Sequence, residues 1–542
     1  MNERVDVLIV GAGPTGLTLA CELISQGISF RIIDKSTSST KASRAIGISA
    51  RALEVLHHFG AAEPLVARGV RCGHAYFQSG ARRTAKISAA TVRHCRFPFM
   101  LSVPQSATEE VLEHRLTELG GTVERGAELV ALDVRADSVI ATAATADGAS
   151  EESVTAGWVV GADGSHSAVR KFSGIPFDTK EAPETFMIVD VFGERASTDA
   201  GHYYFHPDGM ALIAPLPDGS FRLAATVHGE QGRTATLEYV QELFDRRTGS
   251  GIRVRELRDA GWGVATVKVR TGIASRYRSG RCLIAGDAAH SYGPLGGQGM
   301  NGGIQDACNL AWKLALVCRG VAGESLLDSY EKERLHGASL AMQAATSQTK
   351  LATIRPRVLR QLRDALLGLG TITGLLDRLL VPTLTQLSIS YPVESLPGSD
   401  KATSAQAGRR VPDVAISGGS ATVRVHDLLK PGRFTALVVG VRQSDVPEIE
   451  RIAKHFEARH KGLVSPVVLG RETIALSLAG IEQHVDAGGV VHDELAADQP
   501  AVLLVRPDGR LAGRRSLARA PEFDSVLDQV LGSTAPLAAA TR

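Results

Sequence analysis

A strand, a glycine loop and a helix follow one another at the start of the chain, and this arrangement constrains the fold more than any other feature. The β-branched run Val7–Val10 leads into the motif Gly11-x-Gly13-x-x-Gly16, after which the apolar residues recur with a helical spacing. A second apolar strand, Ile28–Ile33, ends at Asp34. The segment therefore predicts one βαβ unit of a parallel sheet.

The three glycines match the fingerprint of a dinucleotide-binding turn. Gly11 permits the turn, Gly13 lets the backbone approach a pyrophosphate, and Gly16 lets the helix pack on the strand. The start of the helix offers free N–H groups and the positive end of a dipole to phosphate. Asp34 stands 18 residues after Gly16 and is placed to bind ribose hydroxyls. We predict adenine dinucleotide binding; the alternative is that the glycines only relieve packing.

Two further buried strands end at acidic residues. The run Trp158–Ala162 ends at Asp163, and the run Arg281–Ala285 ends at Gly286 and Asp287. Open α/β sheets bind their ligands at the carboxyl ends of strands. An acid at the end of a buried strand also needs a partner, so both side chains are expected at a ligand site.

A second glycine match, Gly297-x-Gly299-x-x-Gly302, predicts a different role. It begins ten residues after Asp287 and not directly at a strand end, so it is not a second nucleotide motif. Its backbone can pass close to a flat ligand and start the helix that continues to Val317, with its amides directed at negative charge. An anionic reduced flavin is such a ligand, and a flexible loop is the alternative.

The remaining pattern divides the chain into domains. Alternating strands over 181–270 predict an antiparallel sheet inserted into the nucleotide fold, whose two parts are 1–180 and 271–396, the second with a helical extension. A polar segment at 397–406 is typical of a linker, and 407–542 predicts a separate α/β domain. Residues Ser106–Glu109 form a capping box that would start a helix just after Gln105.

Composition excludes several functions. There are 60 basic and 58 acidic residues, so a net charge of +2 does not favour nucleic acid or anionic membranes as partners. No secretory leader and no apolar run of about 20 residues is found, which predicts a cytoplasmic protein that binds no membrane. Six cysteines without a Cys-x-x-Cys pair or zinc spacing predict neither disulfides nor metal.

The strand His202–His206 could suggest a metal site. Its two histidines would be about 13 Å apart on one face, too far to share a zinc ion. One face of the strand, either Tyr203 with Phe205 or His202 with Tyr204 and His206, could instead line a substrate pocket. We take Tyr204 and His206 as the substrate candidates, with ordinary sheet packing as the alternative.

Three motifs in order carry a family resemblance. The glycine fingerprint is followed by Gly161-Ala162-Asp163-Gly164-Ser165-x-Ser167-x-Val169-Arg170 and by Gly286-Asp287-Ala288-Ala289-His290, which continues to Gly296-Gly297-Gln298-Gly299-Met300-Asn301. The run Gln305–Leu314 extends the match. The chain resembles the group A FAD-dependent aromatic hydroxylases, which have the para-hydroxybenzoate hydroxylase fold. Its linker and terminal domain resemble the phenol hydroxylase and aromatic polyketide hydroxylase branch.

The resemblance implies an α/β fold: an FAD-binding Rossmann-like parallel sheet, an inserted antiparallel-sheet substrate domain and a C-terminal thioredoxin-like domain. It implies a monooxygenase that uses FAD, NADPH or NADH, and dioxygen to hydroxylate a phenolic or polycyclic aromatic substrate through a flavin hydroperoxide. A less favoured alternative is a non-catalytic flavin- or nucleotide-binding protein. The terminal domain has no cysteine after Cys318, so it cannot do dithiol chemistry; packing or contact between the copies of a homodimer is its expected role.

The resemblance also implies residue roles. Gly11, Gly13, Gly16 and Asp34 would hold the ADP half of FAD, and Arg44 and Gln105 would reach its pyrophosphate side. Asp163 would lie where FAD and NAD(P)H approach, and Asp287 would bind the ribityl hydroxyls. Gly299, Met300 and Asn301 would meet the flavin ring, and Pro294 would lie beside the pocket where oxygen and substrate react.

One departure from the family concerns the segment after Arg44. Simple phenol hydroxylases carry an acid there, whereas Ala45–Ile48 is apolar in this chain. Polyketide-type substrates that are already acidic or nucleophilic need no such base, which favours that branch. Hydroxylation of a small simple phenol in aromatic catabolism remains the alternative. His290 is more readily explained as a structural residue than as the missing base.

Overall fold

The computed structural model describes residues 4–39, 45–145, 148, 150–194, 199–227, 236–249, 251–258, 264–293, 297–392, 407–416, 423–478, 481–495 and 499–531. Arg44, Pro294 and the expected linker 397–406 lie outside these residues.

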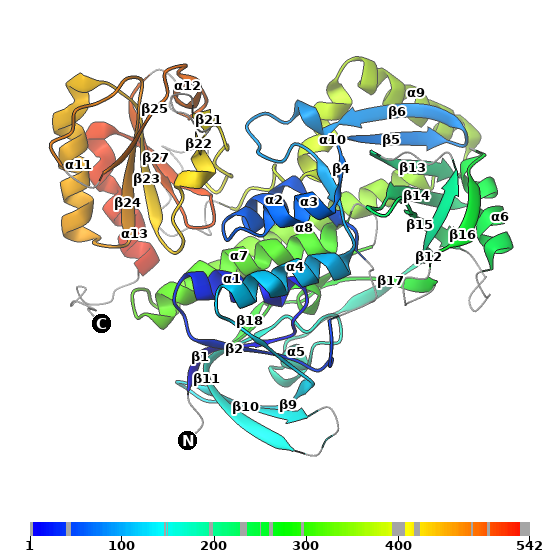
Figure 1. Cartoon of the computed structure of the whole chain (residues 1–542), viewed down its shortest axis with the longest axis horizontal. Helices are drawn as coiled ribbons and strands as arrows, with labels where there is room; N and C mark the ends of the chain where they lie inside the picture. Colours follow the sequence, from blue (N-terminus) through cyan, green and yellow to red (C-terminus); the bar gives the residue numbers. More distant parts are fainter. Residues whose placement is uncertain are drawn as a thin grey trace.

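A parallel sheet forms the base of the molecule (Figure 1). Its central order is β19-β11-β1-β2-β8, and each neighbouring pair is parallel. Residues Val7–Ile9 of β1 are fully buried because helices cover the sheet, as is usual for parallel strands. The predicted fold class is therefore confirmed. The strands are β1 (Val5–Val10), β2 (Phe30–Asp34), β8 (Val123–Arg125), β9 (Ala127–Val134), β10 (Val139–Thr145), β11 (Glu151–Gly161), β18 (Arg278–Ser279) and β19 (Cys282–Ile284).

Helix α1 lies between α4 and α7 against this sheet. The helices of this layer are α1 (Pro14–Ser25), α2 (Ala50–His57), α3 (Ala62–Arg68), α4 (Gln105–Glu118) and α7 (Gln298–Cys318). A small sheet of β3 (Gly47–Ile48), β7 (Met100–Ser102) and β4 (Val70–Cys72) lies beside them. The short helix α5 (Ala168–Phe172) contacts β9, β11 and β19. The predicted capping box is wrong, because α4 begins one residue earlier, after Pro104, and has no side-chain cap. The carboxylate of Glu109 instead accepts a hydrogen bond from Gln105 Nε2 at 2.9 Å.

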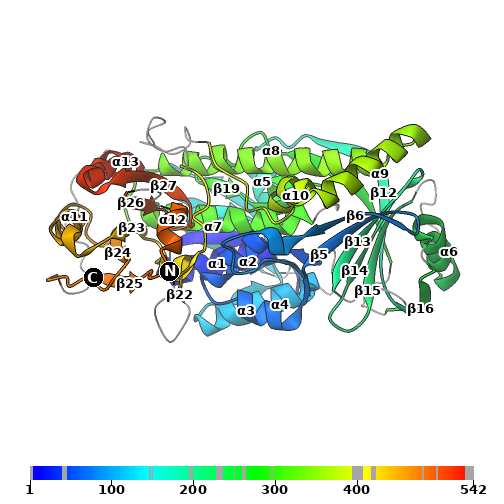
Figure 2. The same cartoon turned by 90° about the horizontal axis from the view of Figure 1, so that it is seen from above.

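A second sheet extends away from the first (Figures 1 and 2). Its order is β20-β17-β12-β15-β14-β13-β5-β6, and β16 pairs with β12. The expected strands of 181–270 are present, but the hairpin of β5 and β6 also belongs to the sheet, and β5 pairs with β13 in parallel. The strands are β5 (His74–Ser79), β6 (Arg82–Ser88), β12 (Thr179–Glu194), β13 (Ala200–His206), β14 (Gly209–Pro215), β15 (Phe221–Val227), β16 (Arg253–Leu257), β17 (Ala265–Ile273) and β20 (His290–Ser291).

Helices flank this second sheet. Helix α6 (Leu237–Thr248) contacts β13, β14 and β16, while α9 (Arg357–Ile372) and α10 (Leu375–Leu384) contact β6. Helix α8 (Leu326–Ala352) runs alongside α7 (Figure 2). Within the described parts of the chain no single helix is long and apolar enough to cross a membrane; α9 and α10 together pass that test but meet at 95°.

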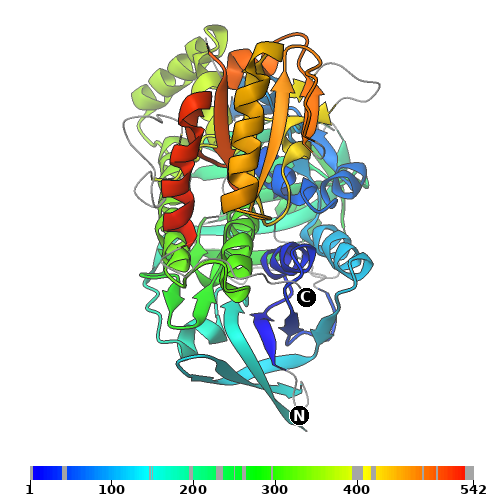
Figure 3. The ribbon, with the colours of Figure 1, turned by 90° about the vertical axis from the view of Figure 1, so that its left-hand side faces the viewer.

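The C-terminal domain is a five-stranded sheet of order β25-β24-β23-β26-β27. Strands β25, β24 and β23 are parallel, whereas β26 and β27 are antiparallel, which is a thioredoxin-like arrangement. Figure 3 shows α11 and α13 side by side on its outer face. The elements are β21 (Ala415–Ile416), β22 (Val423–Arg424), β23 (Phe434–Val441), α11 (Val446–Arg459), β24 (Val464–Gly470), β25 (Glu482–Val485), α12 (Val490–Leu495), β26 (Ala501–Val505), β27 (Leu511–Ser516) and α13 (Phe523–Leu531).

A buried charged cluster joins this domain to helices α7 and α8. Arg506, in the turn between β26 and β27, forms two hydrogen bonds of 2.8 and 2.9 Å with Glu333 of α8. Lys313 of α7 donates to the same carboxylate at 2.8 Å, and all three side chains are at most 1% exposed. Burial lowers the pKa of Lys313 to about 8. Burial alone would raise the pKa of Glu333, but Arg506 and Lys313 hold it well below its ordinary value.

We predict that Glu333→Gln destabilises the protein by about 3–5 kcal/mol, because it leaves the buried Lys313 without its carboxylate and Arg506 with Asp508 as its remaining anion. Urea unfolding followed by circular dichroism measures this loss. Asp328→Asn is the matched control on the same helix: Asp328 is 59% exposed beside Arg278, and its loss should cost less than about 1 kcal/mol.

The depressed pKa of Glu333 also predicts how the effect of Glu333→Gln on stability changes with pH. Because the folded-state pKa of Glu333 is depressed, its stabilisation is present above the unfolded pKa of about 4.3 and is lost as the pH falls below it. The stability difference between wild type and Glu333→Gln should therefore shrink in acid. Equal effects of Glu333→Gln and Asp328→Asn at neutral pH would contradict the role given to the buried cluster.

Candidate functional site

A cavity of about 900 Å³ lies at the carboxyl ends of the parallel strands. It extends from the glycine loop to the second sheet, so that both sheets contribute to one site. Its lining includes Gly13, Asp34, Gln105, Gly164, Arg170, Asp287, Gly299 and Met300 from the first layer, and Thr179, Ile188, Val267, Lys268 and Arg270 from the second sheet. A volume of this size lies at the upper end of the range for small-molecule and cofactor sites.

The glycine loop has the geometry that its sequence predicts. Gly11 has a φ of +102°, and a Cβ atom there would lie 2.4 Å from the carbonyl oxygen of Ala162. A Cβ atom on Gly16 would lie 1.9 Å from the carbonyl oxygen of Gly11, so this glycine allows the helix to approach the loop. No atom lies within 4 Å of the corresponding position on Gly13, which borders the cavity. Gly13 is also the N-cap of α1 and provides no side-chain cap.

Asp34 lies at the end of β2 and fixes the adjacent turn. One carboxylate oxygen accepts from the amide of Ala12 at 2.7 Å, and the other accepts from the amide of Ser36 at 2.8 Å. The carboxylate therefore holds the glycine loop while it lines the cavity. This position is consistent with contact to a ribose, although the contact itself remains a prediction.

Asp163 lies just after β11, at the start of α5. Its Oδ2 atom accepts from the amides of Ala168 and Val169 at 2.6 and 3.2 Å. Its Oδ1 atom is buried and has no hydrogen-bond partner among the residues that the structure describes. Burial raises the pKa of this carboxyl group. The neighbours Ala162 and Gly164 line the cavity, so Asp163 supports its wall.

Asp287 is exposed in the cavity, in the 3-10 turn η2 (Gly286–Ala288). Asp306 of α7 holds this turn in place, because its Oδ2 atom accepts a hydrogen bond from the amide of Gly286 at 2.9 Å. The same oxygen lies 2.7 Å from His290 Nε2. His290 is fully buried, which agrees with a structural role for it.

The start of α7 forms another wall. The helix begins at Gln298, directly after Gly297 in the left-handed region with a φ of +61°, and its N-cap has no side-chain hydrogen bond. Gly299 and Met300 line the cavity. Asn301 is buried and its side chain binds the segment that joins β3 to α2: its Oδ1 accepts from the Ser49 amide at 2.8 Å, and its Nδ2 donates to the Gly47 carbonyl at 2.9 Å. The side chain of Asn301 therefore joins the start of α7 to this segment, and its expected contact with the flavin ring remains a prediction.

Gln105 lies at the cavity edge, at the first residue of α4. Its backbone amide donates to the carbonyl of Ala45 at 3.0 Å, so the side chain lies next to the segment that follows Arg44. The positions of Arg44 and Pro294 are not described, and their expected roles remain predictions.

The substrate candidates on β13 do not line the cavity. Tyr204 is 3% exposed and belongs to the apolar cluster that packs against α6, together with Phe244. His206 lies near Arg247 of α6, at 3.4 Å. The other face of the strand packs toward α9 and α10, where Phe205 is buried. Strand alternation identified the two faces but could not show that helices pack against both of them.

A chain of side chains that the sequence did not predict links the C-terminal domain to the cavity wall. The Arg510 guanidinium lies 3.7 Å from the ring centre of Tyr391. The Tyr391 hydroxyl accepts from Arg334 Nη1 at 3.1 Å, and Arg334 Nε donates to Asp306 at 2.5 Å. Asp306 then holds the turn that carries Asp287. The separation of these residues along the chain left no local signal for this connection.

The residues of the site fit a flavin dinucleotide. Two uncapped helix N-termini, those of α1 and α7, open at the same cavity and offer amide donors to anionic groups. The open space at Gly13 lets a pyrophosphate approach the backbone. Fold and site together define a flavin-binding α/β oxidoreductase.

Comparisons with known proteins agree with this class of protein. The FAD binding domain family matches residues 4–345, and the aromatic-ring hydroxylase C-terminal family matches residues 404–534. Pentachlorophenol 4-monooxygenase of Sphingobium chlorophenolicum is 30% identical over 545 residues, 97% of this chain and 96% of that protein. The 12-dehydrotetracycline 5-monooxygenase/anhydrotetracycline 6-monooxygenase of Streptomyces rimosus is 31% identical over 521 residues, 93% of this chain and 94% of that protein.

A solved structure shows the same architecture over the whole length. The OxyS anhydrotetracycline hydroxylase from Streptomyces rimosus superposes with a TM-score of 0.75 at 29% identity, covering 98% of this chain and 100% of that chain. The chain belongs to the family of FAD-dependent aromatic-ring monooxygenases. The predicted enzyme class and the predicted use of FAD and NAD(P)H are thereby confirmed.

We predict that Asp306→Asn weakens FAD binding at least about tenfold, or about 1.4 kcal/mol. The neutral amide is a poorer partner for Arg334 and His290, so the turn carrying Asp287 loosens. Fluorescence titration of the apoprotein with FAD measures the dissociation constant. Asp364→Asn is the control, because Asp364 pairs with Arg363 at 2.7 Å on α9 and does not line the cavity. Equal FAD affinity in both variants would show that Asp306 does not support the turn that carries Asp287.

Proposed function

We propose that this protein hydroxylates a polycyclic, polyketide-type aromatic substrate, using FAD, NADPH or NADH, and dioxygen. The observation that carries the proposal is the single cavity that joins the two uncapped helix N-termini and Asp287 to the face of the second sheet. A cofactor held at the first layer would meet a substrate held against the sheet within this cavity.

The cofactor would be held along the first layer. Gly11, Gly13, Gly16 and Asp34 would bind the ADP half, with Gln105, and by expectation Arg44, near the pyrophosphate. Asp287 would bind the ribityl hydroxyls, and the Gly299–Met300 segment would lie against the flavin ring. Bound FAD supplies the electron transfer from NAD(P)H and the activation of dioxygen, which side chains cannot supply.

The protein itself contributes position, charge and the exclusion of water. Ile188 and Val267 give the sheet side of the cavity an apolar surface, and Lys268 adds a cation that attracts an acidic, phenolate-like substrate. The N-terminal dipole of α7 favours negative charge beside it. Apolar walls keep water away from the reacting atoms. Pro294 retains its predicted place beside the reacting substrate.

The substrate class rests on the segment after Arg44 and on the relatives. Ala45 lines the cavity and Ile48 is fully buried, so this segment offers no general base to the substrate. Substrates with intrinsically acidic or nucleophilic rings react without one. The tetracycline-type relative supports a polycyclic substrate. The pentachlorophenol relative, which matches 97% of this chain, supports the second candidate, a small phenol.

The domain division is also a proposal. We propose that 1–180 and 271–396 bind FAD, that 181–270 binds substrate, and that 407–542 is a supporting domain. The placement of β5 and β6 in the second sheet adds residues 74–88 to the substrate side. Formation of a homodimer and a cytoplasmic location stay predictions that gel filtration and fractionation can test.

A substrate panel tests the proposed function. Purified FAD-loaded enzyme is given NADPH or NADH with single-ring phenols or multi-ring aromatic polyketides, and hydroxylated product is measured per NAD(P)H consumed. We expect close to one product per NAD(P)H with a multi-ring substrate and mostly hydrogen peroxide with simple phenols. Efficient coupling with single-ring phenols alone would select the second candidate. Failure of every compound to stimulate NAD(P)H oxidation would oppose both.

We predict that Asp287→Ala weakens FAD binding at least about tenfold, because it removes the carboxylate that would bind the ribityl hydroxyls. FAD content per chain after gel filtration, together with titration of the apoprotein, gives the measurement. Asp178→Ala, an exposed acid before β12 that does not line the cavity, is the control. Unchanged FAD retention in Asp287→Ala would refute the role assigned to this side chain.

A further inference from the structure

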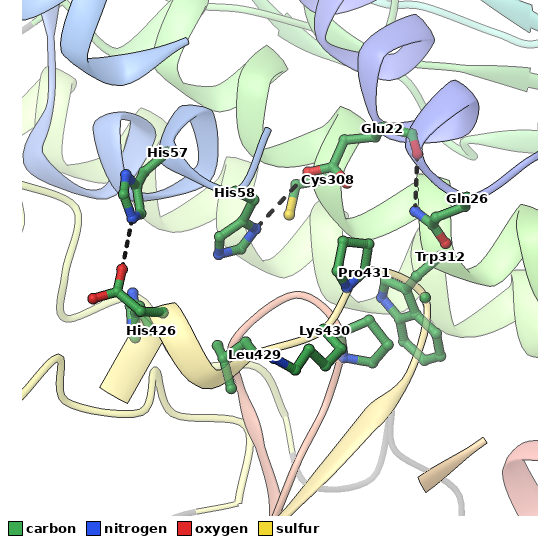
Figure 4. A pocket seen from close by; sticks show the side chains of 13 residues that line it. Glu22, Gln26, His57, His58, Cys308, Trp312, His426, Leu429, Lys430 and Pro431 are labelled. Carbon is green, nitrogen blue, oxygen red and sulfur yellow. Dashed lines mark hydrogen bonds and ion pairs between the residues drawn. The ribbon is translucent and has the colours of Figure 1, made fainter. Parts of the chain in front are cut away.

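A second cavity, of about 180 Å³, lies between the flavoprotein core and the C-terminal domain. Its walls come from α1, α2 and α7 on one side and from the segment that precedes β23 on the other (Figure 4). It is lined by Glu22, Gln26, His57, His58, Cys308, Trp312, His426, Asp427, Leu429, Lys430, Pro431, Gly432 and Pro507. It shares no lining residue with the FAD cavity.

Buried polar atoms without partners gather around this cavity. Five side chains that line it each have one buried nitrogen or oxygen atom with no hydrogen-bond partner among the described parts of the chain. These atoms are Glu22 Oε1, Gln26 Oε1, His58 Nε2, Trp312 Nε1 and His426 Nδ1. Buried polar atoms in proteins nearly always have a partner, which can be an ordered water molecule or an ion. The cavity therefore has the chemistry of a site that holds a polar occupant.

Three of the side chains converge on one point. Glu22 of α1, His58 at the end of α2 and Cys308 of α7 each direct a potential ligand atom inward, and these atoms lie within 4.8 Å of one another. His58 Nδ1 and Glu22 Oε1 are 3.9 Å apart, too far for a hydrogen bond. Figure 4 shows the three side chains grouped at one side of the cavity.

We propose that Glu22, His58 and Cys308 bind a zinc ion between the two domains. Oxygen, nitrogen and sulfur ligands bind zinc at about 2.0–2.3 Å, which places the ligand atoms of a tetrahedral site about 3.5 Å apart. The three atoms now lie within 4.8 Å of one another, so zinc binding would have to draw them closer together. The fourth ligand would be a water molecule in the cavity, where Gln26 and His426 offer further hydrogen bonds.

The charges of the three proposed ligands favour a zinc ion in this cavity. A carboxylate, a thiolate and a neutral imidazole together balance the two positive charges of zinc, and Asp508 offsets part of the positive charge that Arg51 and Arg510 place near Cys308. Burial raises the pKa of the Cys308 thiol well above its ordinary value, and the metal must therefore displace the thiol proton. The sulfur and nitrogen ligands favour zinc over magnesium or calcium, which prefer oxygen.

The adjacent cluster of Glu54, Asp413 and His426 is a poorer metal site although it is fully buried. Glu54 already pairs with Arg51 and Arg410, and Asp413 pairs with Arg424 at 2.8 Å. These cations neutralise the acids and repel a metal ion. By contrast, no salt bridge to arginine or lysine is found for Glu22 within the described residues.

Metal analysis of the FAD-loaded enzyme tests the proposal. The protein is treated with dipicolinic acid, freed of chelator, titrated with zinc and analysed by mass spectrometry for bound metal. We expect one zinc per chain, with affinity that rises with pH because binding displaces the thiol proton. We expect the thermal midpoint of the full chain to rise with zinc.

Substitutions of the proposed ligands test which side chains bind the zinc ion. His58→Gln and Cys308→Ala should each weaken zinc binding by more than about tenfold, because each loses a direct ligand. His57→Gln is the matched control: His57 lines the same cavity, but its nitrogens pair with Glu63 at 2.8 Å and Asp427 at 3.0 Å. FAD content per chain shows whether each variant is folded.

A second readout does not depend on the variants. Cobalt(II) in a tetrahedral site with a thiolate ligand absorbs at longer wavelengths than oxidised flavin, so its addition to wild-type enzyme should produce such bands, and zinc should remove them. Absence of stoichiometric zinc and of these bands would overturn the proposal and leave water as the occupant. Zinc binding that survives both ligand substitutions would also overturn it. Neither result depends on the aromatic substrate.

Discussion

The buried ion cluster of Arg506, Glu333 and Lys313 is the interaction on which the arrangement of the domains depends. Removing three charges from water is tolerated only when each finds its partners, and Asn309 completes the set by donating to Glu333 at 2.7 Å and to Asp508 at 3.2 Å. Two of these partners come from the turn after β26, and the others come from α7 and α8. The C-terminal domain can therefore occupy only a narrow range of positions without leaving a buried charge unpaired.

Helix α7 carries this constraint to the FAD cavity. Its first residues, Gln298 to Met300, line the cavity, while Trp312 packs edge-on against Phe434 of β23 at 5.7 Å. One rigid helix thus touches the cofactor site at one end and the core of the C-terminal domain at the other. This geometry explains how a thioredoxin-like domain without cysteines can serve a flavoenzyme: it holds α7 and α8 in place. The contact of Arg510 with Tyr391 adds a second connection through Arg334 and Asp306.

Sequence analysis predicted features whose residues are close together in the sequence and missed contacts between residues that are far apart in it. The glycine loop, Asp34 and Asp287 could be predicted because strand, turn and helix are contiguous in the sequence, and the parallel topology then brings the strand ends together. The hairpin of β5 and β6 was missed because its pairing with β13 joins residues more than 120 positions apart. Tyr204 was chosen from a correct alternation, but none of the residues of β13 lines the cavity, because one face packs against α6 and the other toward α9 and α10. The contact of Asn301 with the flavin ring remains a prediction, whereas its side-chain hydrogen bond to the Gly47 carbonyl is a contact that no local pattern encodes.

The same reasoning explains why cysteine spacing predicted no metal. Such spacing detects ligands that one short segment supplies, as in zinc fingers. Glu22, His58 and Cys308 are separated by 36 and 250 residues, so no motif of that kind can include them. They come together because α1 and α7 pack against each other and α2 ends beside them. The glycine fingerprint that fixes the start of α1 and the glycine loop that fixes the start of α7 therefore also determine whether the three ligand atoms can meet. The proposed zinc ligands on α1 and α7 lie away from the ends of these helices that line the FAD cavity. The packing of the two helices that FAD binding requires would therefore also bring the ligands together, and a zinc site could arise in a flavoprotein without any change to the cofactor motifs.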